Sequence, residues 1–145
     1  MISTAHMLTG AAIAANSDSW PVVLLASFLS HFVLDVVPHW DPDYQRWPRQ
    51  TWFIFAFLDL LVGFLLVFWL MGEQLNGLTF LAMMAGILPD ILTITALYFK
   101  SKLGKKFVAW HKSLQNIQTD WRGMLSQLFL VLAMGVIIVI SRELN

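Results

Sequence analysis

The sequence predicts an all-α membrane protein in which residues 1–145 form a single helical bundle with about four transmembrane helices. Hydrophobic residues make up 58% of the chain and charged residues 12%, whereas average protein usage is about 45–50% apolar and about 25% charged. The mean hydropathy is +0.68. One soluble core cannot bury this much apolar surface, so we expect the lipid bilayer as a partner. The net charge of zero indicates no nucleic-acid partner.

The predicted elements follow from the apolar runs. Ser3–Ala15 is a short apolar helix, too short to span a membrane, and is either half-inserted or packed inside the bundle. Trp20–Val37 is long enough to span, and the preceding "NSDS" offers an N-cap, with Pro21 at an early helical position. Three further spans are predicted at Thr51–Met71, Gly77–Tyr98 and Met124–Ile140.

The segment from Lys100 to Arg122 differs in composition from the rest of the chain. It contains six of the nine Lys and Arg residues, and its apolar residues recur close to a helical stripe. This pattern predicts an amphipathic helix on the membrane surface. The positive-inside rule places it on the cytoplasmic side, together with the loop that carries Arg46 and Arg49.

Three aspartates fall inside predicted membrane helices, namely Asp35, Asp59 and Asp90. An Asp at the centre of a membrane helix costs about 2.5–3.5 kcal/mol on insertion scales. The predicted spans contain no Lys or Arg to compensate these charges. The remaining possibilities are protonation, protonated histidine partners or a metal ion. Histidine and carboxylate together favour a divalent metal, with Zn first and Mn or Fe as alternatives.

The stretch "SHFVLDVVPHWDPD" concentrates such groups. His31 and Asp35 are four residues apart and therefore share one face of a helix. Pro38 predicts that the helix ends near Val37, so that His39 swings over the helix end. The topology brings all four histidines to one half of the membrane. The predicted metal ligands, for one or two ions, are His6, His31, Asp35, His39, Asp90 and His111.

Two other aspartates are candidates for catalytic roles. Asp59 has no charged neighbour in its own helix, so it must meet a partner elsewhere in the bundle. Asp41 follows His39 in a D-P-D turn and is a candidate ligand or general base, although Asp before Pro is also ordinary turn chemistry. Asp43 in the same turn is a weaker candidate ligand.

The motifs resemble those of the bacterial inner-membrane metal-dependent hydrolase family. That family typically carries an early His before an apolar helix, P-D-x-D-H, H-R-G-x-T-H-S and S-H-x-x-x-D. The corresponding residues in this chain are His6, then Pro89 and Asp90, then His111 as a partial match, then Ser30, His31 and Asp35.

The resemblance is incomplete in ways that can be stated residue by residue. Leu92 and Thr93 stand where the family has its second Asp and its His, and the order of the motifs differs. The H-x-x-x-D helix is also similar to the ligand helix of zinc-dependent phospholipase C. Together the resemblances imply metal-assisted hydrolysis of a phosphoester. The first implies a multi-pass protein of the bacterial inner membrane, whereas the phospholipase C enzymes are soluble helical proteins.

These observations lead to one expected function and two alternatives. The expectation is a membrane-embedded metal-dependent hydrolase that acts on a lipid or lipid-linked phosphate at the cytoplasmic interface. An ion or proton transport module is the first alternative, because intramembrane Asp and His also mark ion pathways. A non-catalytic subunit of a membrane complex is the second. The sequence leaves the oligomeric state open.

Overall fold

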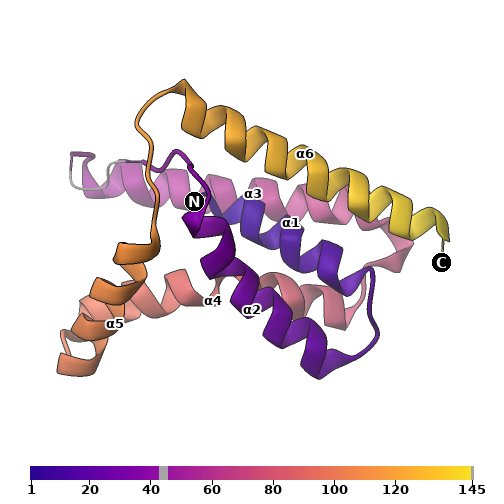
Figure 1. Ribbon diagram of the computed structural model, residues 1–145, viewed down its shortest axis with the longest axis horizontal. Coiled ribbons are helices and arrows are strands. Elements are labelled where there is room, and N and C mark those ends of the chain that lie inside the picture. The colour runs from indigo at the N-terminus through magenta and orange to yellow at the C-terminus, as the bar shows by residue number, and fades with distance from the viewer. Residues whose placement is uncertain (43–45, 145) are drawn as a thin grey trace.

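The computed structural model describes residues 1–42 and 46–144, and within them the chain is helical with no strand. Figure 1 shows the helices running lengthwise through the molecule, with α5 at one end. The predicted all-α fold class is therefore confirmed. The elements are α1 (Ser3–Ala14), α2 (Trp20–Val36), α3 (Arg49–Met71), the 3-10 turn η1 (Gly72–Gln74), α4 (Gly77–Phe99), α5 (Lys102–Leu114) and α6 (Trp121–Leu144).

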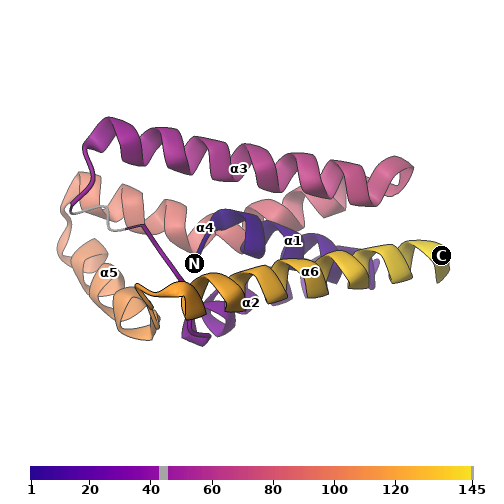
Figure 2. The ribbon, with the colours of Figure 1, turned by 90° about the horizontal axis from the view of Figure 1, so that it is seen from above.

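The short helix α1 is the centre of the bundle. Nine of its 12 residues are buried, and it packs against α2, α3, α4 and α6 (Figures 1 and 2). Its length of about 18 Å is too short for a bilayer about 30 Å thick. Of the two predicted placements, packing inside the bundle is therefore confirmed, with Leu8 and Ala11 fully buried.

Close approach between α1 and α4 depends on glycine. A Cβ atom on Gly10 would lie 2.5 Å from the carbonyl oxygen of Ala82, and one on Gly86 would lie 2.8 Å from the carbonyl oxygen of His6. Neither position can hold a larger residue without moving the backbones apart. These contacts fix the distance and the register between α1 and α4, and therefore the position of the His6 side chain.

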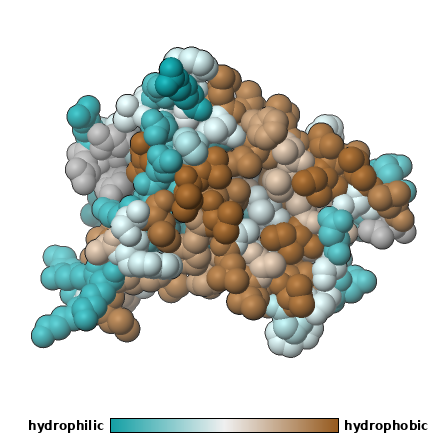
Figure 3. Space-filling model, viewed as in Figure 1, coloured by the Kyte–Doolittle hydropathy of each residue, from teal (hydrophilic) through white to brown (hydrophobic). Residues whose placement is uncertain are grey.

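Three helical segments are long and apolar enough to cross a membrane, at Arg49–Gln74, Gly77–Phe99 and Trp121–Leu144. Their outer faces expose large apolar side chains such as Phe57, Trp69 and Phe129. Figure 3 shows hydrophobic residues over the middle of the molecule and hydrophilic residues gathered towards its ends. These features indicate a membrane protein. The helix α2 is a shorter apolar helix of 17 residues, so the fourth span stays a prediction.

The end of α2 follows the predicted stop. The helix ends at Val36, and Val37 before the proline takes an extended conformation with ψ 135°. The chain after α2 then pairs with the segment between α5 and α6. The N–H of His39 donates to the Asn116 carbonyl at 3.0 Å, and the N–H of Gln118 donates to the His39 carbonyl at 2.7 Å.

The basic amphipathic segment is helical over a shorter range than its composition suggests. Helix α5 runs from Lys102 to Leu114, and its buried residues are Val108 and His111. It packs against α4 and α2. The segment behind it, 115–120, is not helical. The structure thus places a histidine of this segment inside the protein, whereas contact of α5 with a membrane surface stays a prediction.

We predict that Gly10→Ala lowers the stability of the folded protein by about 1–3 kcal/mol, because the added methyl group overpacks the contact between α1 and α4. The measurement is thermal unfolding in detergent. Gly135→Ala in α6 is the matched control, since its Cβ would have only a Leu70 carbon at 3.7 Å and alanine favours helix. Equal melting temperatures for the two variants would contradict the prediction.

Candidate metal centre

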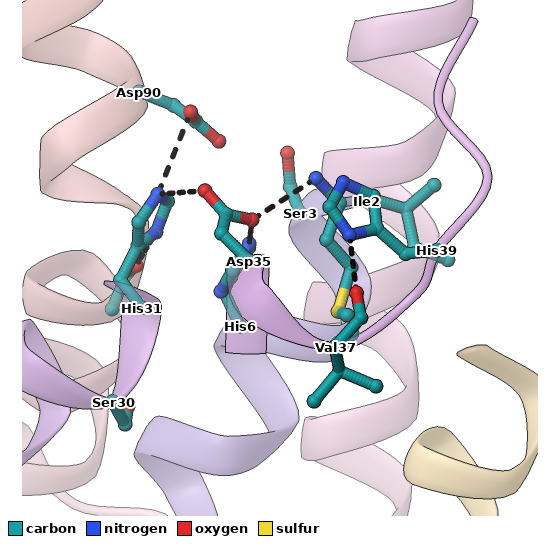
Figure 4. Close-up of polar contacts among 12 residues, drawn as sticks. Ile2, Ser3, His6, Ser30, His31, Asp35, Val37, His39 and Asp90 are labelled. Carbon is teal, nitrogen blue, oxygen red and sulfur yellow. Dashed lines mark hydrogen bonds and ion pairs between the residues drawn. The ribbon is translucent and has the colours of Figure 1, made fainter. Parts of the chain in front are cut away.

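Helix α2 supplies the first pair of the site. His31 and Asp35 are both fully buried, and His31 Nε2 lies 3.2 Å from Asp35 Oδ2. Their spacing of four residues puts the two side chains one above the other on the helix face that points into the bundle. The sequence-predicted pair is therefore present as a contact (Figure 4).

Two further helices complete a four-residue cluster. His111 from α5 places its Nε2 atom 3.0 Å from Asp35 Oδ2 and 3.1 Å from His31 Nε2. Asp90 from α4 places Oδ1 3.6 Å from His31 Nε2 and 4.0 Å from His111 Nε2. Asp90 is the more accessible member, with a side-chain exposure of 31%, whereas the other three are buried. We call these four residues the His/Asp cluster.

The hydrogen bonds behind the two imidazoles determine which ring nitrogen carries a proton. His31 Nδ1 lies 2.7 Å from the Gly86 carbonyl, which can only accept, so Nδ1 donates. His111 Nδ1 lies 2.7 Å from the Thr93 hydroxyl, whose own hydrogen goes to the Pro89 carbonyl. Thr93 therefore accepts from His111 Nδ1. In their neutral forms, both rings present an unprotonated Nε2 to the cluster.

This arrangement leaves lone pairs facing one another. Two Nε2 lone pairs 3.1 Å apart, with a carboxylate oxygen of Asp35 close to both, repel unless a cation or a proton lies among them. A ring whose far nitrogen donates to a carbonyl or hydroxyl is the usual support of a metal-binding histidine. The donor set and its supporting hydrogen bonds therefore fit a metal ion.

The separations among His31 Nε2, His111 Nε2 and Asp35 Oδ2, 3.0–3.2 Å, fit ligands of a single small ion, and Asp90 lies farther from both rings. Nitrogen and oxygen atoms bound tetrahedrally at about 2.0–2.1 Å lie about 3.3 Å from one another. The five measured separations run from 3.0 Å between His111 Nε2 and Asp35 Oδ2 to 4.0 Å between His111 Nε2 and Asp90 Oδ1. Small side-chain adjustments, chiefly of the partly exposed Asp90, would close the remaining difference.

His6 from α1 meets the other oxygen of Asp35. His6 Nε2 lies 3.5 Å from Asp35 Oδ1, and the His6 ring stacks on the ring of His31 with centroids 3.9 Å apart. The amino nitrogen of Met1 also lies 3.2 Å from Asp35 Oδ1. His6, His31 and Asp35 form a second group whose ligand atoms all lie within 4.8 Å of one another. Asp35 thus has one oxygen towards each group, and the structure accommodates the prediction of one or two ions without deciding between them.

His39 lies apart from these residues. It is buried, its Nδ1 donates to the Val37 carbonyl at 2.8 Å, and it belongs to neither of the His/Asp groups found in the described residues. Burial lowers the pKa of His39. The end of α2 at Val36 breaks the stripe that began at His31, so the predicted role of His39 as a ligand has no geometric support.

The predicted catalytic aspartates line one groove that leads to the cluster. Asp41, Asp59 and Asp90 all border this groove between α3 and α4. Asp41 is in the loop after α2, and burial raises the pKa of its carboxyl to about 6. Asp43 lies outside the described residues.

Asp59 makes a set of contacts that explains its presence in a membrane helix. Its carboxylate accepts the N–H of Ser3 at 2.6 Å and the N–H of Thr4 at 3.2 Å, and the Thr4 hydroxyl lies 2.7 Å from Oδ1. These N–H groups belong to the first turn of α1, which has no side-chain cap of its own. Asp59 therefore acts as a cap supplied by a different helix, and it is not part of the His/Asp cluster.

The supporting residues Gly86 and Thr93 were not predicted from the sequence. Thr93 follows Asp90 by three residues, which places both on one face of α4. That spacing is a signal that could have suggested Thr93. The role of the Gly86 carbonyl cannot be predicted from the sequence, because every residue has a backbone carbonyl group.

Fold and site together define a class: an all-helical protein with three helices able to span a membrane and a buried group of His and Asp side chains able to hold a metal ion. Comparison with known protein families, with curated proteins and with solved structures finds no match to this chain.

We predict that Thr93→Val lowers metal affinity about 10–100-fold, because His111 loses the acceptor that orients its ring. Thr95→Val is the matched control. Both hydroxyls donate to the carbonyl four residues earlier, but only Thr93 contacts a histidine. The measurement is competition with a metal-chelating dye. Equal metal affinity of the two variants would contradict the assignment of Thr93 as the acceptor of the His111 Nδ1–H group.

We also predict that Asp59→Ala lowers stability by about 0.5–2 kcal/mol, as loss of a helix cap does, whereas Asp59→Asn loses less because its amide oxygen still accepts. Thermal unfolding in detergent provides the comparison. The same pair tests the catalytic hypothesis for Asp59. An Asn variant that is as stable as the wild type but hydrolytically inactive would indicate a catalytic role beyond capping.

Proposed function

We propose that the protein is a membrane-embedded metal-dependent hydrolase that acts on a phosphoester of a lipid or lipid-linked substrate. The observation that carries the proposal is the pair of facing Nε2 atoms of His31 and His111, 3.1 Å apart, beside the carboxylate of Asp35. Their Nδ1 atoms are engaged as donors, so a cation among the Nε2 atoms would remove the repulsion.

Residues of the cluster would hold that cation, and the groove would bring a substrate to it. His31, His111, Asp35 and Asp90 would hold it, Zn being the first choice for this donor set and Mn or Fe the alternatives. When bound, a divalent cation polarises a phosphoryl group and activates water as a nucleophile. Asp90 borders the groove as well as the cluster, so a substrate in the groove would reach the ion from that side.

Proton transfer in such a reaction needs a group beside the substrate. Asp41 borders the groove and does not belong to either His/Asp group of the described residues, which leaves its carboxyl for this role. The carboxylate of Asp59 also borders the groove, but both of its oxygens accept N–H groups of α1. Asp41 is therefore the better candidate for a general base.

The alternative of an ion or proton pathway has less support. Beyond the cluster the bundle contains an apolar core that includes Leu8, Val67 and Ile138, all fully buried. A non-catalytic subunit role would leave the metal site in place but without hydrolysis.

The proposal also includes the location of the protein in a bacterial inner membrane and the orientation of its site towards the cytoplasm.

The proposal predicts that protein purified in detergent without chelators contains a tightly bound divalent metal. His31→Gln and His111→Gln should each weaken binding at least about tenfold, because each removes a ligand. His39→Gln is the control, since His39 is equally buried but lies outside the cluster. Metal content is measured by elemental mass spectrometry, and hydrolysis by phosphate release from a lipid phosphate.

Three results would count against the proposal. Wild-type protein that binds no added Zn, Mn or Fe would remove its basis. Equal loss of metal from His39→Gln and His31→Gln would show that the wrong residues have been assigned. Metal-loaded protein that moves protons across liposomes, without hydrolysing any phosphoester, would favour the transport alternative.

A further inference from the structure

A large apolar groove runs between α3 and α4. Its volume is about 680 Å³. Within the described chain, α1 packs against both α3 and α4, and Met7 of α1 lines the groove. The walls are formed by side chains of α3 and α4, among them Phe55, Leu60, Phe64, Phe80, Met84 and Ile91.

The groove differs in polarity along its length. From the level of Asp59 and Asp90 towards α5 and the start of α3, apolar residues such as Trp52 and Leu97 alternate with polar ones, namely Asp41, Arg49, Asp59, Asp90, Thr93, His111, Lys112 and Gln115. Towards the turn between α3 and α4, the lining is apolar. The groove is therefore polar where it meets the His/Asp cluster and apolar beyond it.

The apolar part has the length of one membrane leaflet. Asp90 and Phe80 both line the groove and are separated by ten residues of α4, which corresponds to about 15 Å. The hydrocarbon core of a bilayer is about 30 Å thick. A chain that extends from the level of Asp90 to that of Phe80 would thus cover about half of this thickness.

We propose that this groove binds one acyl chain of a membrane lipid, with the phosphoester headgroup of that lipid at the His/Asp cluster. The headgroup assignment rests on the proposed function, because a cation held by the cluster, together with Arg49 and Lys112, supplies the positive charge that complements a phosphate. The lipid enters sideways from the bilayer, since α3 and α4 both expose apolar outer faces.

The features of the groove fit a lipid better than they fit a protein segment. In a bilayer, lipid acyl chains surround the outer faces of membrane helices, so they are the molecules in direct contact with a groove between α3 and α4. The single polar end matches a molecule with one charged group and a long apolar tail. An apolar helix from a second copy would meet the carboxylates of Asp41 and Asp90 without a group to compensate them.

The test uses the full-length protein in vesicles that contain phosphatidic acid with a diazirine on one acyl chain. Light attaches the chain to whatever it contacts, and peptide mass spectrometry locates the adduct. We expect adducts on groove residues of α3 and α4, such as Phe64 and Phe80. Diacylglycerol with the same diazirine should label them less, because it lacks the phosphate. Labelling spread evenly over the outer faces of α3, α4 and α6 would overturn the proposal.

Matched substitutions test the groove directly. Leu60→Trp fills the groove and should lower labelling of its residues by roughly tenfold, because loss of only a few buried methylene contacts changes binding by that factor. Leu61→Trp is the control, since Leu61 is exposed on the same helix and does not line the groove. Phe80→Trp with Leu81→Trp is a second such pair on α4. Equal labelling in the variants of both pairs, or adducts replaced by cross-linked dimers, would overturn the proposal.

Metal content and hydrolysis of a short-chain soluble phosphoester are measured on the same preparations. These readouts separate the two proposals. Metal and soluble hydrolysis without groove labelling would leave the hydrolase proposal standing and reject the acyl site. Groove labelling without bound metal, equal for phosphatidic acid and diacylglycerol, would keep acyl binding but reject the headgroup assignment together with the hydrolase.

Discussion

The structure depends on how a single carboxylate, that of Asp35, is accommodated inside an apolar bundle. Asp35 is fully buried and has no Lys or Arg partner among the described residues; it is instead surrounded by the ring nitrogens of His6, His31 and His111 and by the amino nitrogen of Met1. A charge in this position is costly unless it is paired and hydrogen-bonded. The start of α1, the end of α2 and α5 therefore meet at one point. Neutral imidazoles do not compensate the carboxylate by themselves, so the Met1 amino group and a cation or proton among the ring nitrogens would supply the positive charge.

The helix α1 makes this convergence possible. It is too short to cross a membrane, but its central position brings His6 and the start of the chain to Asp35. Two features hold it there. Glycines at positions 10 and 86 permit close backbone contact with α4, and Asp59 from α3 accepts the N–H groups of the first turn. A buried helix start needs such an acceptor, because water cannot reach it.

The residues of the His/Asp cluster differ in how deeply they are buried. His31, Asp35 and His111 are buried, and the hydrogen bonds to Gly86 and Thr93 orient the two imidazole rings. Asp90 and His111 both line the groove between α3 and α4, and Asp90 is the partly exposed member of the cluster. Under the proposed function, a buried set of ligands with an accessible edge would let a bound metal ion reach a membrane-bound substrate. The polarity of the groove, charged at one end and apolar beyond, is consistent with this division.

The sequence by itself determined the helices, the apolar exterior and the i, i+4 pair of His31 and Asp35, because these features depend on composition and on spacing within one helix. It also determined the end of α2, since Pro38 disfavours helix at the residue before it. Only the tertiary structure decided which distant groups meet. Asp35 and His111 are 76 residues apart in the chain, and no local pattern distinguishes His111, which joins the cluster, from His39, which does not. In the same way, the three aspartates have different surroundings: Asp35 lies against the rings of three histidines, Asp90 borders the groove and Asp59 caps α1. Long-range packing of α1, α4 and α5 sets these distances, and packing of that kind is not encoded in any single segment.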